Sequence, residues 1–197
     1  VSHRYLTGLT LDEVKTMLRK LGKRMGIRFD YEACEQIFKW YGGHPLLTRQ
    51  ACSCLNTFLS SIQAKPIEIT NSVFKENKES IDRELVFYSD HAVSEIRQFY
   101  SDEYYLFELL SIGQELEFKE FSRESSEIKH LLGYQLIRIS DHGYEINIPV
   151  IAERVALESK RNEGRELLYP IVKDPDRENW LKRRIEELCS EFRQLER

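Results

Sequence analysis

Apolar side chains recur at steps of three and four over the first 62 residues, and this spacing constrains the fold more than any other feature. Such spacing is typical of amphipathic helices, whose apolar positions share one face. Thr10 and Asp30 are suitable N-caps for two helices, and Pro45 suits the first turn of a third. Helix ends are favoured at four glycines: Gly22, Gly26, Gly42 and Gly43. The sequence therefore predicts three helices joined by tight turns, forming a small bundle over residues 1–66.

Residues 67–100 are predicted to link this bundle to a second domain. Residues 67–69 (Ile-Glu-Ile) alternate and are expected to be extended. Thr70 or Asn71 is expected to cap one helix of the link, and Asp90 a second one.

The pattern changes again from residue 101. It predicts a helix, an extended or short helical stretch, a helix and two strands, in that order: 102–110, 115–118, 125–132, 135–140 and 144–148. The two strands flank Asp-His-Gly, a hairpin signal. This order is that of a winged helix, a variant of the helix-turn-helix, and we assign it to residues 101–158.

The last part, residues 159–197, is predicted as a linker followed by an amphipathic helix. The linker is the hydrophilic stretch Ser159–Gly164. The helix carries an apolar seam with spacings of 4, 3, 4 and 3, formed by Leu181, Ile185, Leu188, Phe192 and Leu195. This helix either packs on its own protein or forms a seam with another copy or an effector. We interpret both ends of the chain as cut points.

The overall composition excludes several classes of protein. Hydrophobic residues make up 41% and charged residues 31%, as in a folded protein rather than a disordered one. A net charge of −4 gives no global attraction to nucleic acid. No apolar run approaches the roughly 20 residues that span a bilayer, and no signal-peptide pattern is present, so we expect no membrane association. Four cysteines are expected to be core thiols in a reducing cytoplasm: Cys34, Cys52, Cys54 and Cys189.

Two segments carry a resemblance to a known family. The segment Leu6–Val14 (LTGLTLDEV) and the turn Tyr41–Leu47 (YGGHPLL) resemble the lid of STAND and origin-recognition-like ATPases of the AAA+ class. In that family a helix with the pattern gL-x-x-x-E leads, and a GG-x-P turn opens a later lid helix over the nucleotide. A winged helix follows, and Gly143–Val150 looks like its end in bacterial members. The resemblance covers residues 5–158 and matches the predicted order of domains.

The resemblance implies a nucleotide-proximal site at this turn. Gly43 and Pro45 would approach the base or sugar, with His44 between them, and Arg49 would reach toward a phosphate. Paired glycines allow close approach of the backbone, and a helix N-terminus offers free N–H groups. The same residues are also explained as a helix stop and a helix start, and Arg49 as a solvated surface arginine.

The chain departs from the family in two respects. Plant-receptor members have a Met-His-Asp triplet near the end of the winged helix, where this chain has Ile148-Pro149-Val150. The phosphate-binding pattern G-x-x-x-x-G-K-[ST] is absent from the sequence. We therefore expect no ATP hydrolysis by this chain alone, no catalytic residue and no metal ligand set. ATP or ADP would be held by a missing N-terminal ATPase core.

The resemblance implies a regulatory function. The lid would close over the nucleotide, the winged helix would report the nucleotide state, and the C-terminal helix would couple it to oligomerisation or an effector. Bacterial defence or signalling is a setting for such a switch. A protein-interaction module is an alternative.

A DNA-binding winged-helix regulator is a second alternative, and charge argues against it. Residues 101–158 carry five basic and twelve acidic side chains, a net charge of −7, which repels a polyanion. Residues 1–62 carry nine basic and five acidic side chains, a net charge of +4. Five of the bases crowd one predicted helix: Lys15, Arg19, Lys20, Lys23 and Arg24. That face is either solvated or meets ATP phosphates, an acidic neighbouring domain or nucleic acid.

Overall fold

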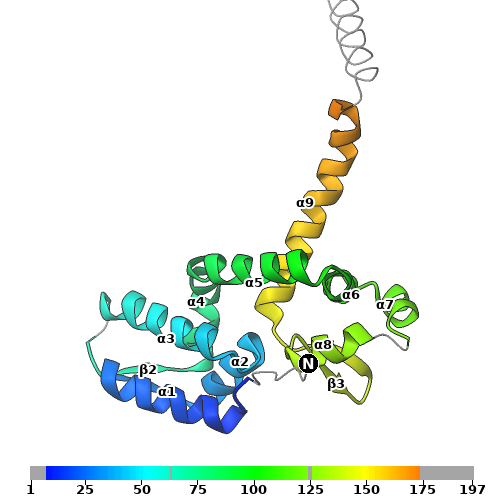
Figure 1. The fold of residues 1–197 in the computed structure, drawn as a ribbon. Helices are drawn as coiled ribbons and strands as arrows, with labels where there is room; N and C mark the ends of the chain where they lie inside the picture. Colours follow the sequence, from blue (N-terminus) through cyan, green and yellow to red (C-terminus); the bar gives the residue numbers. More distant parts are fainter. Residues whose placement is uncertain (1–7, 63, 124–125, 174–197) are drawn as a thin grey trace, which may run out of the picture. The chain divides into compact units, whose positions relative to one another are not determined.

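The protein is mostly helical, with two small two-stranded sheets in its described part, which confirms the predicted fold class at this level (Figure 1). The computed structural model describes residues 8–62, 64–123 and 126–173. Two compact units divide the chain, Val1–Ala156 and Leu157–Arg197. The elements from α1 to β4 all belong to the first unit. Within the described ranges, no helix combines the length and apolar character needed to cross a bilayer.

Among its described residues, the first half of the chain contains four helices and a parallel pair of strands. In chain order these elements are α1 (Leu11–Met25), β1 (Ile27–Phe29), α2 (Tyr31–Tyr41), α3 (Pro45–Ser60), β2 (Ile67–Ile69) and α4 (Asn71–Glu84). The three helices predicted for the first 62 residues are thus confirmed, and so is the extended stretch at residues 67–69.

The second half contains five helices and an antiparallel hairpin among its described residues. These elements are α5 (Val86–Phe99), α6 (Ser101–Ser111), α7 (Glu115–Phe121), α8 (Ser126–Gly133), β3 (Ile137–Ser140), β4 (Gly143–Ile146) and α9 (Pro149–Lys173). The stretch predicted as extended or as a short helical entry is the helix α7.

Local capping explains where the first helices begin and end. The Thr10 hydroxyl accepts a hydrogen bond from the Glu13 N–H at 3.3 Å, and the Glu13 carboxylate accepts one from the Thr10 N–H at 2.8 Å. The Asp30 carboxylate caps α2 by accepting a hydrogen bond from the Ala33 N–H at 2.6 Å, and Gly26 ends α1 with a φ of 72°. Gly22, predicted near a helix end, instead lies inside α1, where its missing side chain admits the backbone carbonyl at the start of β1.

The strand β1 was not predicted from the sequence. It connects α1 to β2 in the first half of the chain. It pairs in parallel with β2, so that Ile27 is opposite Ile67 and Phe29 is opposite Ile69. Helix α1 packs on β1, α2 and α3, while α4 packs on α2 and α3. We call α1–α4 with β1 and β2 the N-terminal group. The segment 67–100, predicted as a link, therefore contributes β2 and α4 to this group.

A partly buried carboxylate links α4 to α2. Asp82 of α4 accepts hydrogen bonds from the Trp40 indole N–H at 3.0 Å and from the Tyr41 hydroxyl at 3.1 Å. Lys78 pairs with Asp82 at 3.3 Å and lies over the Trp40 ring, 3.3 Å from its centroid. Tyr41 is fully buried, and its pKa is raised by burial and by the neighbouring Asp82. Asp82 thus satisfies a hydroxyl that has no access to water.

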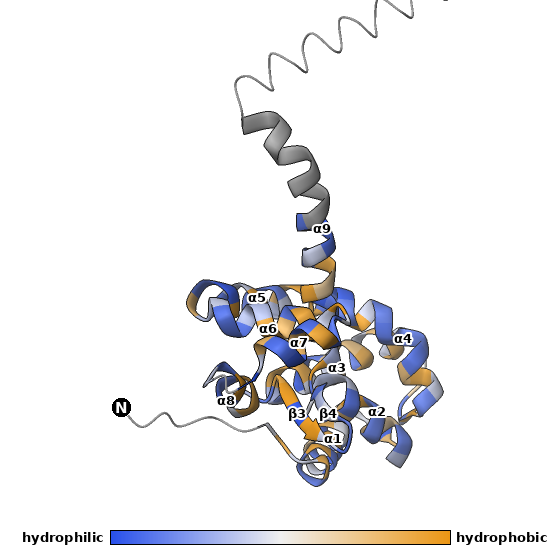
Figure 2. Ribbon diagram, turned by 90° about the vertical axis from the view of Figure 1, so that its right-hand side faces the viewer, coloured by the Kyte–Doolittle hydropathy of each residue, from blue (hydrophilic) through white to orange (hydrophobic). Residues whose placement is uncertain are grey.

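The hairpin group consists of α6, α7, α8, β3 and β4. Helix α6 packs on α7, α8 and β4, and the hairpin pairs Ile137 with Ile146 and Ser140 with Gly143. Figure 2 colours β3 largely as hydrophobic, although only Ile137 on it is buried and Ile139 is 70% exposed. The predicted hairpin is therefore confirmed, and Ile139 on it is exposed to solvent.

Two local predictions were wrong. Asp90 does not cap a helix: α5 begins at Val86, directly after α4, because the buried Leu85 keeps a helical backbone between them. Asp90 lies inside α5 and accepts a hydrogen bond from Arg154 of α9 at 2.7 Å. The stretch Ser159–Gly164, expected to be a linker, instead continues α9, and Lys160, Arg161 and Glu163 within it are good helix formers.

Replacing Asp82 by alanine is expected to lower the free energy of unfolding by about 2–4 kcal/mol, because it leaves a buried hydroxyl and an indole N–H without an acceptor. Chemical denaturation followed by circular dichroism would measure the loss. Glu79→Ala, an exposed carboxylate on the same helix, is the matched control and should change stability by less than about 0.5 kcal/mol. Equal losses in the two variants would contradict the role assigned to Asp82.

Candidate functional site

The predicted site residues lie in the turn between α2 and α3 and at the start of α3. Gly42 and Gly43 have φ values of 59° and 69°, in the left-handed region that favours glycine. Tyr41 ends α2, and His44 is the N-cap of α3, with Pro45 at the first helical position. The helix stop and helix start predicted from Gly-Gly-His-Pro are therefore confirmed.

Backbone atoms from other parts of the same chain lie close to the two glycines. The Leu9 N–H donates to the Gly43 carbonyl at 2.8 Å. A Cβ on Gly43 would overlap the Leu9 carbonyl, and a Cβ on Gly42 would overlap the Asn147 carbonyl. Both sides of the turn are thus packed against backbone, one from the residues before α1 and one from the residues after β4.

The hairpin group completes this contact with two amide side chains. The Gln135 side-chain oxygen accepts from the Gly8 N–H at 2.6 Å. Asn147 donates through its side chain to the Gln135 carbonyl at 2.8 Å and to the Gly42 carbonyl at 3.5 Å. Gln135 itself has a φ of 55°, which is uncommon for a residue with a side chain.

Six residues thus join three segments that are far apart in the sequence. We call them the junction: Gly8, Leu9, Gly42, Gly43, Gln135 and Asn147. The segment before α1 contacts the N-terminal group through Leu9 and the hairpin group through Gly8. Of these residues, only Gly43 was predicted as a site residue. Nothing in the local sequence pattern marks Gln135, whose partners lie up to 127 positions away.

His44 lies beside the junction and faces inward. Its Nδ1 accepts a hydrogen bond from the Leu47 N–H at 3.3 Å, which caps α3. Burial lowers its pKa below the ordinary value, and the hydrogen bond with its own backbone opposes this only in part. The neutral form, with the proton on Nε2, is therefore the form that the folded chain favours.

A cavity of about 280 Å³ adjoins His44. Its walls come from α5, α6, α8 and the start of α9, and include Tyr100, Tyr134 and Glu103. The Tyr134 hydroxyl donates to the Tyr100 hydroxyl at 3.1 Å, and Glu103 pairs with Nδ1 of His130 at 2.5 Å. The rest of the wall is largely apolar: Ala92, Ile96, Leu131, Leu136, Ile148 and Ile151. The cavity thus separates the start of α3 from the hairpin group.

Pro45 and Arg49 lie on a different side of the turn from His44. Both are exposed, and their spacing of four residues puts them on one face of α3. Neither lines the 280 Å³ cavity. The structure therefore brings Gly43 and His44 to the junction and leaves Pro45 and Arg49 at the surface. The predicted seam lies outside the described residues: Leu181, Ile185, Leu188, Phe192 and Leu195.

The described residues offer no group of three or more metal-ligating side chains. Burial raises the pKa of the Cys52 thiol to about 12, and it raises that of Cys34 as well, so both are neutral at physiological pH. The predicted core placement is confirmed for these two cysteines, while Cys54 is half-buried. No protein-family model, curated protein or solved structure matches the chain.

Replacing Gly43 by alanine should destabilise the protein by about 3 kcal/mol or more, because the methyl group meets the Leu9 carbonyl as well as an unfavourable φ. Gly113→Ala separates the two effects. Gly113 has a φ of 81° but no atom within 4 Å of an added Cβ, so only about 1–2 kcal/mol should be lost. Urea denaturation of both variants measures the difference. Similar losses of stability in the two variants would mean that the close contact of the Leu9 carbonyl with Gly43 does not limit the side chain at this position.

His44→Asn should flatten the dependence of stability on pH between about 7 and 5. In the wild type the unfolded chain protonates His44 near its ordinary pKa of 6.5, whereas the folded chain resists protonation. The unfolded state then binds more protons, so stability falls as the pH falls. Asparagine keeps an N-cap acceptor without this titration. Urea midpoints at several pH values would test this, and an unchanged pH slope in the variant would contradict it.

Proposed function

We propose that the chain is a non-catalytic regulatory region of an AAA+/STAND-type ATPase. In this proposal the N-terminal group is the lid, and the hairpin group is a winged helix in which α7 occupies the place of the first strand. Together they sense the nucleotide state of a core that precedes the chain. They pass it on to oligomerisation or to an effector. Bacterial defence or signalling is the setting proposed for such a switch.

The junction is the observation that carries the proposal. Gly8 and Leu9 would be the first described residues after the proposed core, and they donate to Gln135 and Gly43 respectively. If this segment moves, its hydrogen bond to each group must therefore either break or move with it. Each hydrogen bond contributes only about 0.5–1.5 kcal/mol net, a size that a change in bound nucleotide can overcome.

The surface of α3 supplies the proposed contact with nucleotide. Pro45 and Arg49 are exposed on one face of this helix, next to the turn. Arg49 has no ion-pair partner among the described residues, so its guanidinium is free to meet a phosphate of ATP or ADP held by the core. Gly43 and His44 would not contact the nucleotide themselves. They would act on this contact indirectly, by fixing where α3 starts.

Titration calorimetry with ADP and ATP tests the proposal on two proteins: this chain, and the same chain extended toward the N-terminus of its natural polypeptide. Binding by the extended protein alone is expected, because the phosphate-binding loop is not in this chain. Arg49→Ala in the extended protein should weaken ATP binding about tenfold, while Lys39→Ala, another exposed cation of the N-terminal group, should leave it unchanged.

Two outcomes would overturn the proposal. Tight binding by this chain alone would mean that a nucleotide site lies within the 197 residues. Binding by neither protein would remove the ATPase assignment and leave a protein-interaction module as the stronger function.

A further inference from the structure

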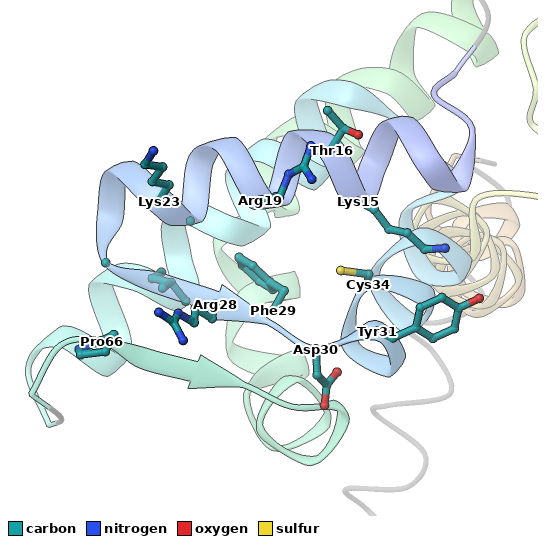
Figure 3. Close-up of a pocket in the computed structure, with 13 residues that line it drawn as sticks. Lys15, Thr16, Arg19, Lys23, Arg28, Phe29, Asp30, Tyr31, Cys34 and Pro66 are labelled. Atoms are coloured by element: carbon teal, nitrogen blue, oxygen red, sulfur yellow. The ribbon is translucent and has the colours of Figure 1, made fainter.

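A cavity of about 670 Å³ lies away from the junction, between α1 and the segment formed by β1 and the start of α2. Figure 3 shows Lys15, Arg19 and Lys23 along α1, above Phe29 on β1. Tyr31 lies near one end of this row. We call this cavity the basic cleft.

The basic cleft carries a surplus of positive charge. Four cations line it, Lys15, Arg19, Lys23 and Arg28, against one carboxylate, that of Asp30. That carboxylate is already engaged, because it accepts the Ala33 N–H at 2.6 Å as the N-cap of α2.

Three of the four cations have no charge partner in the part of the chain that the structure describes: Arg19, Lys23 and Arg28. All three are exposed. Lys15 is different, since it pairs with Asp12 at 3.3 Å and lies 4.2 Å from the centroid of the Tyr31 ring. Unpaired cations held around a concavity attract an anion more strongly than cations dispersed on a flat, solvated surface.

The cations are arranged in a row rather than at a point. Lys15, Arg19 and Lys23 are spaced by four residues, so they follow one face of α1 over about 12 Å. A row of this kind matches a chain of phosphates better than a single anion, and the guanidinium of Arg19 can bind a phosphate by two hydrogen bonds.

Aromatic rings next to the row distinguish among polyanions. Tyr31 is 60% exposed and Phe29 is partly exposed, and both line the basic cleft. A positively charged groove with exposed aromatic side chains is the arrangement on which single-stranded nucleic acids bind, with the backbone on the cations and a base on a ring. An acidic protein segment would use the charges but would gain little from the rings.

We propose that the basic cleft binds single-stranded nucleic acid, through phosphate contacts with Arg19, Lys23 and Arg28 and through stacking of a base on Tyr31. This proposal does not rest on nucleotide-dependent switching at the junction. It also differs from recognition by the hairpin group, whose segment 101–158 has a net charge of −7. The cleft is expected to read no base sequence, because the polar side chains proposed to contact the strand are cations suited to the backbone.

Fluorescence anisotropy with a labelled 12-nucleotide dT or U strand tests the proposal on the purified chain. Three phosphate contacts predict a slope of log affinity against log salt of about −2, so binding should weaken roughly twentyfold between 50 and 200 mM salt. A duplex of the same length should bind more weakly, because the stacking ring needs an unpaired base. Comparing dT with U shows whether DNA or RNA is preferred.

Two pairs of substitutions on α1 distinguish binding at the basic cleft from a general effect of positive charge on affinity. Arg19→Ala with Lys23→Ala should weaken binding about tenfold and reduce the salt slope to about −0.7. Lys20→Ala with Arg24→Ala removes the same charge from the same helix, but these side chains line a different groove, so affinity should change less than about threefold. Alanine keeps the helix in both pairs, which circular dichroism would verify.

Tyr31→Ala should weaken binding about fivefold or more without altering the salt slope, and Tyr31→Phe should restore it. Four results would overturn the proposal: no binding at 50 mM salt, equal effects of the two α1 pairs, duplex binding as tight as single-strand binding, or competition by poly-glutamate as effective as by unlabelled oligonucleotide. The last result would identify an acidic protein segment as the occupant.

Discussion

The left-handed turn at Gly42 and Gly43 is the constraint on which the rest of the first unit depends. Two consecutive residues with positive φ reverse the chain between α2 and α3 with no side chain in the way. Leu9 and Asn147 fill the space that side chains would take. The turn therefore does two things at once: it starts α3, and it forms the point where segments from three parts of the chain meet.

The interactions around this turn differ in how strongly they stabilise the structure. Asp82 ties α4 to α2 through partners that have little access to water, so the N-terminal group resists local opening. The junction, by contrast, consists of a few backbone and amide hydrogen bonds beside a cavity at His44. Regions with few packed apolar contacts open at lower free energy than cores do. The movement proposed above would therefore involve the junction rather than the inside of the N-terminal group.

Features set by neighbouring residues could be predicted from the sequence, and features set by distant partners could not. Thr10 and Asp30 cap helices through bonds to residues three positions on, so their roles follow from local spacing. Strand β1 has three residues and gains its identity from β2, forty positions later, so no periodicity reveals it. Asp90 has the chemistry of a cap, but Arg154 and the buried Leu85 determine its surroundings. Of the candidate site, Gly43 and His44 were predictable as a turn, whereas Gln135 and Asn147 act through tertiary contacts alone.

Helix α1 connects the junction to the basic cleft. The capping box at Thr10 and Glu13 makes the first turn of α1 follow directly on Leu9, whose N–H is bound at Gly43. The same helix carries Arg19 and Lys23, two and three turns further on. A helix of 15 residues transmits displacement as a nearly rigid body. An anion bound in the proposed cleft and a movement of residues 8–9 would therefore act on one element, and any coupling between them would be reciprocal.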